Sequence, residues 1–284
     1  MASIAVDPLQ KVIVKLPPPN FSDIAKSSND VKLKAPNGVA FTAKGTSAHD
    51  GPVSSSLEGK KVLPNGISVT QSWNTANLLS TKVELTNTFA SGLKTEVINN
   101  FNPASGNQGQ KLNFHFQQQN FHGRVFADLK ANGAVSTIAD AVLSHEGFLV
   151  GGEVGYDVQK AAITKYSAAV GYTTGTYNAA ITATNSLNVF AASYYQKVNS
   201  AVEAGAKATW DAKQGSAVGL ELAAKYKIDP ASFAKAKINN LGIASLAYNT
   251  RVNSGLTFGI GGSFDTQKLN EAGHKLGTSF TFEG

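Results

Sequence analysis

The sequence predicts an all-β fold, a transmembrane β-barrel of 19 or 20 strands preceded by a short helix. Apolar residues recur at every second position along most of the chain, so one face of each strand meets an apolar medium. Turn signals separate these segments by roughly 13 residues, the length of a membrane-spanning strand and its turn. No window of about 18 consecutive apolar residues offers a membrane helix, and in lipid only a closed barrel satisfies the backbone of strands.

The amino end departs from this rhythm. A cleaved secretory signal is not expected at residues 1–19, because the short apolar stretch at 12–16 lies among charged residues. Three prolines end it, and residues 20–30 predict a short helix with Ser22 or Asp23 as its cap. An irregular leader is the alternative. No long linker interrupts the strands after it, so residues 31–284 predict a single barrel domain.

Amphipathic strands continue from the first apolar row, Val31, Leu33 and Ala35, to the chain end. Twelve turn signals join antiparallel neighbours. They are Pro36–Gly38, Asp50–Pro52, Pro64–Gly66, Ala90–Gly92, Ser105–Gly106, Asn132–Gly133, Glu146–Gly147, Thr174–Thr176, Gln214–Gly215, Asp229–Pro230, Asn239–Asn240 and Ser254–Gly255. The last row, Leu276, Thr278, Phe280 and Phe282, stays apolar almost to the final residue, so this strand must pair with another.

The polar rows carry more basic than acidic side chains, in a chain of formal net charge +6. The residues expected to line the pore and attract anions are Lys26 on the leader and, on the strands, Lys32, Lys34, Lys44, Lys60, Lys82, Arg124, Lys207, Lys225, Lys227, Lys235 and Lys237. Acidic residues share the rows, Glu84 and Glu96 among them, but are fewer. A water-filled lumen with this excess would concentrate anions. For any single lysine, simple solvation is the alternative interpretation.

No constellation of residues indicates an enzyme. The chain has no cysteine, so it has no disulfide framework, thiolate metal site or cysteine nucleophile. Its five histidines are scattered, with no metal-ligand spacing, and neither a phosphate-binding P-loop nor a nucleophile elbow is present. We therefore predict no catalytic residue, no metal and no cofactor.

Several motifs make the chain resemble the mitochondrial porins, the voltage-dependent anion channels. The stretch from Tyr226 to Tyr248 resembles the family signature, and Trp73–Asn77 resembles its fourth-strand motif. Gly92, Leu93 and Lys94 are similar to a proposed nucleotide-contacting triplet, for which a plain strand turn is the alternative. Segments 145–157 and 263–269 resemble fungal members in particular. The resemblance covers residues 20–284.

This resemblance implies a fold of 19 strands, a helix inside the pore and a place in the mitochondrial outer membrane. It implies passive, voltage-dependent passage of ATP, ADP, phosphate and other small anionic metabolites. It also implies membrane lipids and the barrel-assembly machinery as partners, leaves homo-oligomers open, and gives no nucleic-acid partner. The carboxyl end resembles the insertion signal, with Lys275, Gly277, Phe280 and Phe282 as its defining residues.

Two features depart from the family pattern, the leader and one residue of the fourth strand. The leader passes from Asn29–Asp30 almost at once into Val31, so the second half of the family's helix and its link to the first strand are missing, which puts normal gating in doubt. Residues 1–19 look like an atypical extension that does not resemble the family's leader. Gln71 stands where animal members carry a membrane-facing glutamate, and a neutral amide costs less in lipid than a carboxylate.

Three other functions stay open as alternatives. A protein-translocating or tethering barrel of the same superfamily would have to admit cationic presequences, which this lysine excess repels. A soluble all-β binding protein would have to cover its apolar rows with a second sheet. A bacterial porin is disfavoured by the signature stretch.

An odd strand number has a structural consequence. Up-and-down strands close antiparallel only when their number is even, so 19 strands require one parallel pair. We expect the strand at Val31–Ala35 to pair in parallel with Gly277–Phe282.

Overall fold

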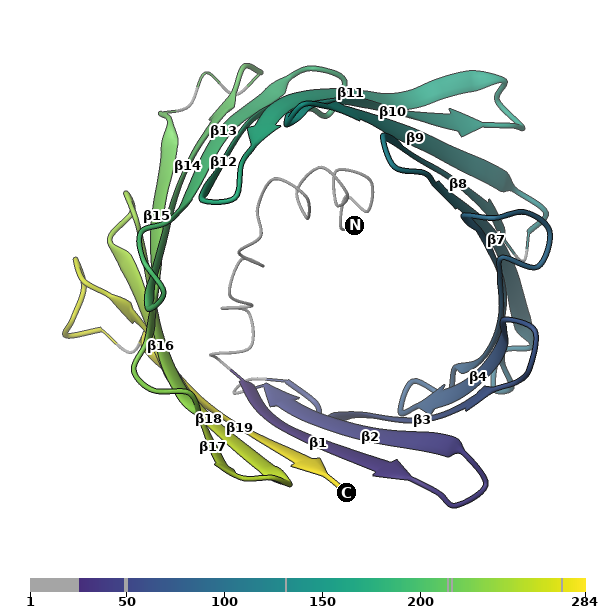
Figure 1. The fold of residues 1–284 in the computed structure, drawn as a ribbon, viewed down its shortest axis with the longest axis horizontal. Helices are drawn as coiled ribbons and strands as arrows, with labels where there is room; N and C mark the ends of the chain where they lie inside the picture. Colours follow the sequence, from purple (N-terminus) through teal and green to yellow (C-terminus); the bar gives the residue numbers. More distant parts are fainter. Residues whose placement is uncertain (1–25, 49–50, 131, 214, 216, 272) are drawn as a thin grey trace.

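Period-two alternation along the chain produces strands that pair in sequence order and close on themselves. The computed structural model describes residues 26–48, 51–130, 132–213, 215, 217–271 and 273–284. Nineteen strands in these residues form one continuous sheet, and Figure 1 shows this sheet as a closed ring seen nearly along its axis. The predicted barrel is therefore confirmed.

The strands are eight to twelve residues long, as spanning strands require. They are β1 (Lys26–Lys34), β2 (Val39–Ala48), β3 (Ser54–Val62), β4 (Ile67–Asn74), β5 (Leu79–Thr86), β6 (Leu93–Asn102), β7 (Asn107–Gln117), β8 (Phe121–Leu129), β9 (Val135–His145), β10 (Phe148–Asp157), β11 (Ala162–Thr173), β12 (Tyr177–Thr184), β13 (Val189–Lys197), β14 (Val202–Asp211), β15 (Gly219–Lys227), β16 (Ser232–Asn239), β17 (Ile243–Asn253), β18 (Leu256–Asp265) and β19 (Lys275–Glu283).

The seam between β1 and β19 is the one parallel pairing among these strands, and it confirms the expected closure. Ser28 pairs with Ser279 and Lys32 with Glu283, while the other edge of β1 pairs antiparallel with β2. In Figure 1 the purple β1 therefore lies between β2 and the yellow β19. On the polar face, the Lys32 ammonium closes the seam with a 2.7 Å ion pair to Glu283.

The first strand begins at Lys26, five residues before the predicted start. The helix predicted over 20–30 is therefore wrong for residues 26–30. Serine and asparagine at 27–29 are weak helix formers, and the edges of β2 and β19 offer them backbone partners. The extension at 1–19 and the predicted helix at 20–25 lie outside the described residues. Within the described part, no helix is long and apolar enough to span a bilayer.

The two faces of the sheet differ sharply in composition. One row carries large apolar side chains that are exposed in the isolated chain, among them Leu57, Trp73 and Leu222. The other row carries Glu84, Asn113 and their polar neighbours, which are buried although polar. Side chains converge on the concave side of a cylinder and splay on its convex side, so the polar row faces the lumen and the apolar row faces lipid.

The described residues of the twelve predicted turns lie between consecutive strands, except that Asn239 is the last residue of β16. In one of them, the two-residue connection between β9 and β10, Glu146 and Gly147 both have positive φ, as a two-residue hairpin turn requires. Six further connections were not predicted. Three of these contain a non-glycine residue with positive φ, namely Asn77, Ala161 or Asn185. None of the three has a Gly or Pro that would have indicated a turn.

Candidate permeation pathway

The candidate site is the lumen wall, and its charged side chains come from the inward row of successive strands. All the predicted strand positions, from Lys32 to Lys237, lie in that row. Lys26 is the first residue of β1 rather than part of a helix. The wall divides into stretches where the basic groups are paired with carboxylates and a stretch where few are.

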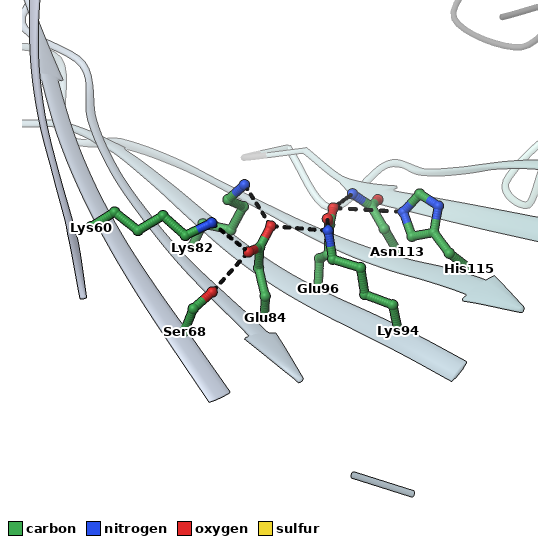
Figure 2. Close-up of polar contacts among 8 residues, drawn as sticks. All are labelled: Lys60, Ser68, Lys82, Glu84, Lys94, Glu96, Asn113 and His115. Atoms are coloured by element: carbon green, nitrogen blue, oxygen red, sulfur yellow. Dashed lines mark hydrogen bonds and ion pairs between the residues drawn. The ribbon is translucent and has the colours of Figure 1, made fainter. Parts of the chain in front are cut away.

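In the wall formed by β3 to β7, three lysines are paired with Glu84 (Figure 2). The carboxylate of Glu84, only 7% exposed, accepts hydrogen bonds from Lys60 (3.2 Å), Lys82 (2.8 Å) and Lys94 (3.1 Å). The Ser68 hydroxyl donates a fourth, at 2.8 Å. Three ammonium groups therefore share one carboxylate, and their attraction for a passing anion is weakened.

A second carboxylate extends this network to the next strands (Figure 2). Lys94 also contacts Glu96 at 2.6 Å, so it bridges two carboxylates on neighbouring strands. The Asn113 amide donates to Glu96 at 3.0 Å, and His115 Nε2 lies 3.7 Å from it. Of the predicted anion-attracting residues, Lys60 and Lys82 thus share the carboxylate of Glu84 with Lys94.

The wall formed by β8 to β11 is paired in the same way. Arg124 donates bidentate hydrogen bonds to Asp140, with N–O distances of 3.0 to 3.2 Å. Lys165 contacts Glu153 at 2.9 Å. Both carboxylates are almost fully buried. Arg124 therefore lies in the inward row, where Asp140 already balances its charge. Its attraction of anions stays a prediction.

The wall formed by β14 to β16 has a surplus of basic groups. Its inward row carries five lysines against three acidic residues. The lysines are 207, 225, 227, 235 and 237, and the acidic residues are Glu203, Asp211 and Glu221. Lys237 contacts Glu221 at 2.9 Å, whereas Lys225 lies 3.6 Å from Glu203. This wall is where the predicted lumen charge is concentrated.

The wall beside the seam adds Lys34 and Lys44. Both lie in the inward row of β1 and β2, and Lys44 pairs across the strands with Asp30. Their neighbour Lys32 is held by Glu283.

The triplet Gly92–Lys94 forms the end of the β5–β6 turn and the start of β6. Gly92 has φ +81°, and a Cβ there would lie 2.2 Å from the carbonyl oxygen of Gln117. Its N–H donates to Asn87, and its carbonyl accepts from Gln117. The turn thus accounts for glycine at position 92, and the Lys94 ammonium is already paired with the carboxylates of Glu84 and Glu96. Contact with nucleotide stays a prediction.

The residues of the predicted insertion signal all lie in β19. Lys275 and Gly277 belong to its inward row, while Phe280 and Phe282 face outward. Phe280 packs against Phe258 at 5.1 Å between ring centroids. The same strand therefore carries both the seam and this motif.

Sequence reasoning placed Glu84 and Glu96 on the polar face but missed their role in neutralising the lysines around them. It also missed the pairing of Asp140 with Arg124 and of Glu153 with Lys165. Cross-strand register brings these groups together, and register depends on turn geometry that the sequence shows only in part. Among the described residues, no three His, Asp or Glu side chains gather as a metal site.

Comparison with known proteins gives consistent matches over nearly the whole chain. The family described as eukaryotic porin matches residues 18–277. The mitochondrial outer membrane protein porin of Neurospora crassa is 58% identical, over 93% of this chain and 99% of its own length. The non-selective voltage-gated ion channel 1 of Saccharomyces cerevisiae is 34% identical, over 94% of this chain and 99% of its own length.

A likeness to solved structures concerns the fold alone. A mutant of the Rh. blastica porin superposes with a TM-score of 0.53 at 11% identity, covering 88% of this chain and 96% of that one. Membrane barrels of distant sequence thus share this architecture.

Proposed function

The chain belongs to the eukaryotic porin family, and we propose that its lumen passes ATP, ADP, inorganic phosphate and other small anionic metabolites by passive diffusion. It is a voltage-dependent anion channel of the mitochondrial outer membrane, which it crosses as a multi-pass β-barrel. Its family is one of channels, and we propose that it has no enzymatic activity.

One observation carries the proposal, the surplus of lysines over carboxylates in the inward row of β14 to β16. Ammonium groups on flexible stems attract phosphate as point charges, without the bidentate grip of arginine. Weak attraction at several points suits permeation, because a tight site would hold the anion and block flux.

The proposed partners follow from the two faces. Lipid covers the outward apolar row, which also offers a surface for homo-oligomers. The outer-membrane assembly machinery would recognise β19, whose Phe280 and Phe282 face outward beside the seam.

Release of ATP from liposomes tests the proposal. Vesicles that contain the refolded protein and trapped ATP should release the ATP through the channel. Protein-free vesicles should retain their ATP, and protein-containing vesicles loaded with a large dextran should retain the dextran. A barrel that passes chloride yet retains ATP would contradict the proposed metabolite traffic.

A further inference from the structure

Three pairs of like-charged residues face each other directly across neighbouring strands of the described lumen wall. They are Glu84 with Glu96, Asp140 with Glu153, and Lys225 with Lys235. Like charges in directly opposed positions destabilise a sheet, so each pair needs counter-charge nearby.

The two acidic pairs find their counter-charge within the barrel. Lys94 bridges Glu84 and Glu96, at 3.1 and 2.6 Å. In the second pair, Arg124 binds Asp140 at 3.0 Å and Lys165 binds Glu153 at 2.9 Å. Both repulsions are therefore compensated by direct ion pairs at hydrogen-bonding distance.

The repulsion between Lys225 and Lys235 is compensated much less by nearby carboxylates. The ammonium groups of Lys225 and Lys235 lie 5.4 and 5.2 Å from the centroid of one ring, that of Phe233. Glu203 lies 3.6 Å from Lys225, beyond hydrogen-bonding distance. Within the described residues, no carboxylate lies within 4.0 Å of the Lys235 ammonium. An aromatic face offers a cation only weak attraction, so two directly paired lysines, both beside Phe233, lack an adequate anion.

We propose that Lys225 and Lys235, gathered over Phe233, form a binding site for the phosphate group of permeating anions. This inference rests on the proposed function and gives it a location. A phosphate carries up to two negative charges and several acceptor oxygens, so it can accept a hydrogen bond from each ammonium and relieve their repulsion. Both lysines are only partly buried, which leaves the site open to the lumen and keeps binding weak.

Conductance in potassium phosphate tests the site, because a channel that binds its permeant saturates as concentration rises. We expect the wild type to reach half-saturation at a lower concentration in phosphate than in chloride. In Lys225→Gln and in Lys235→Gln the half-saturating phosphate concentration should rise about fivefold, since one close charge contributes roughly 1 kcal/mol in this setting. Lys235→Arg keeps the charge and should retain phosphate saturation.

Lys82→Gln is the matched control, because it removes one lumen charge from the wall that Glu84 neutralises. It should shift phosphate half-saturation much less than either glutamine variant. If Lys225→Gln and Lys235→Gln behave like Lys82→Gln in an anion-selective channel, the site is excluded while the proposed function stands. A wild type that passes no phosphate would instead contradict the proposed function.

Folding gives a second readout. Removing one of two repelling ammonium groups should not destabilise the barrel, so both glutamine variants should fold and insert as channels at a yield similar to that of the wild type. If neither variant formed channels, the pair would be structural and the proposal overturned.

Discussion

At the scale of the residue, Glu84 controls how much positive charge the β3–β7 wall presents to the lumen. It accepts hydrogen bonds from three lysines and one serine, whereas Glu58 on β3 lies in the same inward row without such a network. The effect of a carboxylate on selectivity is thus separable from its effect on stability.

Replacing Glu84 should change both properties. Glu84→Gln leaves Lys60 and Lys82 without their carboxylate, so anion preference should rise and the free energy of unfolding should fall by about 1–3 kcal/mol. Glu58→Gln removes the same charge and should raise anion preference without that loss of stability. Reversal potentials and denaturant unfolding measure the two effects. Equal stability of the two variants would contradict the central role of Glu84.

Asp229 gives a pH-dependent prediction at the β15–β16 turn, outside the spanning strands. The N–H of Ala231, 2.7 Å away, holds the pKa of the Asp229 carboxyl below its ordinary value. A depressed pKa stabilises the folded state above the unfolded-state pKa, and this contribution is lost as pH falls through the folded-state pKa. The stability gap between wild type and Asp229→Ala should therefore narrow in acid. Asp229→Asn keeps an acceptor that does not titrate, so its advantage over Asp229→Ala should stay constant with pH, and a gap that widened in acid would contradict this account.

At the scale of the element, the β1–β19 seam can be tested through its register. The chain has no cysteine, so two introduced ones have only each other as partner. Ser28→Cys with Ser279→Cys places both thiols on the inward row of directly paired residues, and oxidation should cross-link them. Ser28→Cys with Lys275→Cys separates the thiols by about 13 Å along β19 and should not cross-link. Gel mobility after limited proteolysis distinguishes the two. A link in the second pair alone would contradict the parallel register.

The β5–β6 turn makes a prediction about its glycine. Gly92→Ala should lower the free energy of unfolding by more than about 1 kcal/mol, because φ is +81° and the new Cβ would strike the Gln117 carbonyl oxygen. Gly106→Ala is the control, since φ there is +67° but nothing lies within 4 Å of the added carbon. Thermal unfolding of both variants in detergent measures the difference. A larger loss in Gly106→Ala would exclude the close approach as the reason for glycine at 92.

The elements also show what the sequence can predict. Period-two alternation and the conformations of glycine and proline depend on local sequence. Strands such as β18 and turns such as Asn65–Gly66 can therefore be predicted from the sequence alone. The start of β1 cannot, because Ser28 and Asn29 pair with β19, at the far end of the chain, as well as with β2. The ion pairs around Glu84 depend on the same long-range register.

At the scale of the whole molecule, the lumen is electrostatically one-sided. Carboxylates neutralise the basic groups from β3 to β11, while β14 to β16 keep a surplus of lysines. Anions should therefore favour one side of the pore. Net charge alone, which the sequence gives, does not reveal this division, because it depends on which strands stand next to each other.

The reversal potential of the reconstituted channel across a KCl gradient tests the central claim, that lumen lysines set anion preference. The wild type should prefer chloride, and charge reversal at Lys32, Lys235 and Lys237 together should abolish or invert that preference. Low ionic strength should enlarge the difference, because the Debye length then spans more of the lumen. A wild type without anion preference, or a preference that survives the triple reversal, would contradict the account.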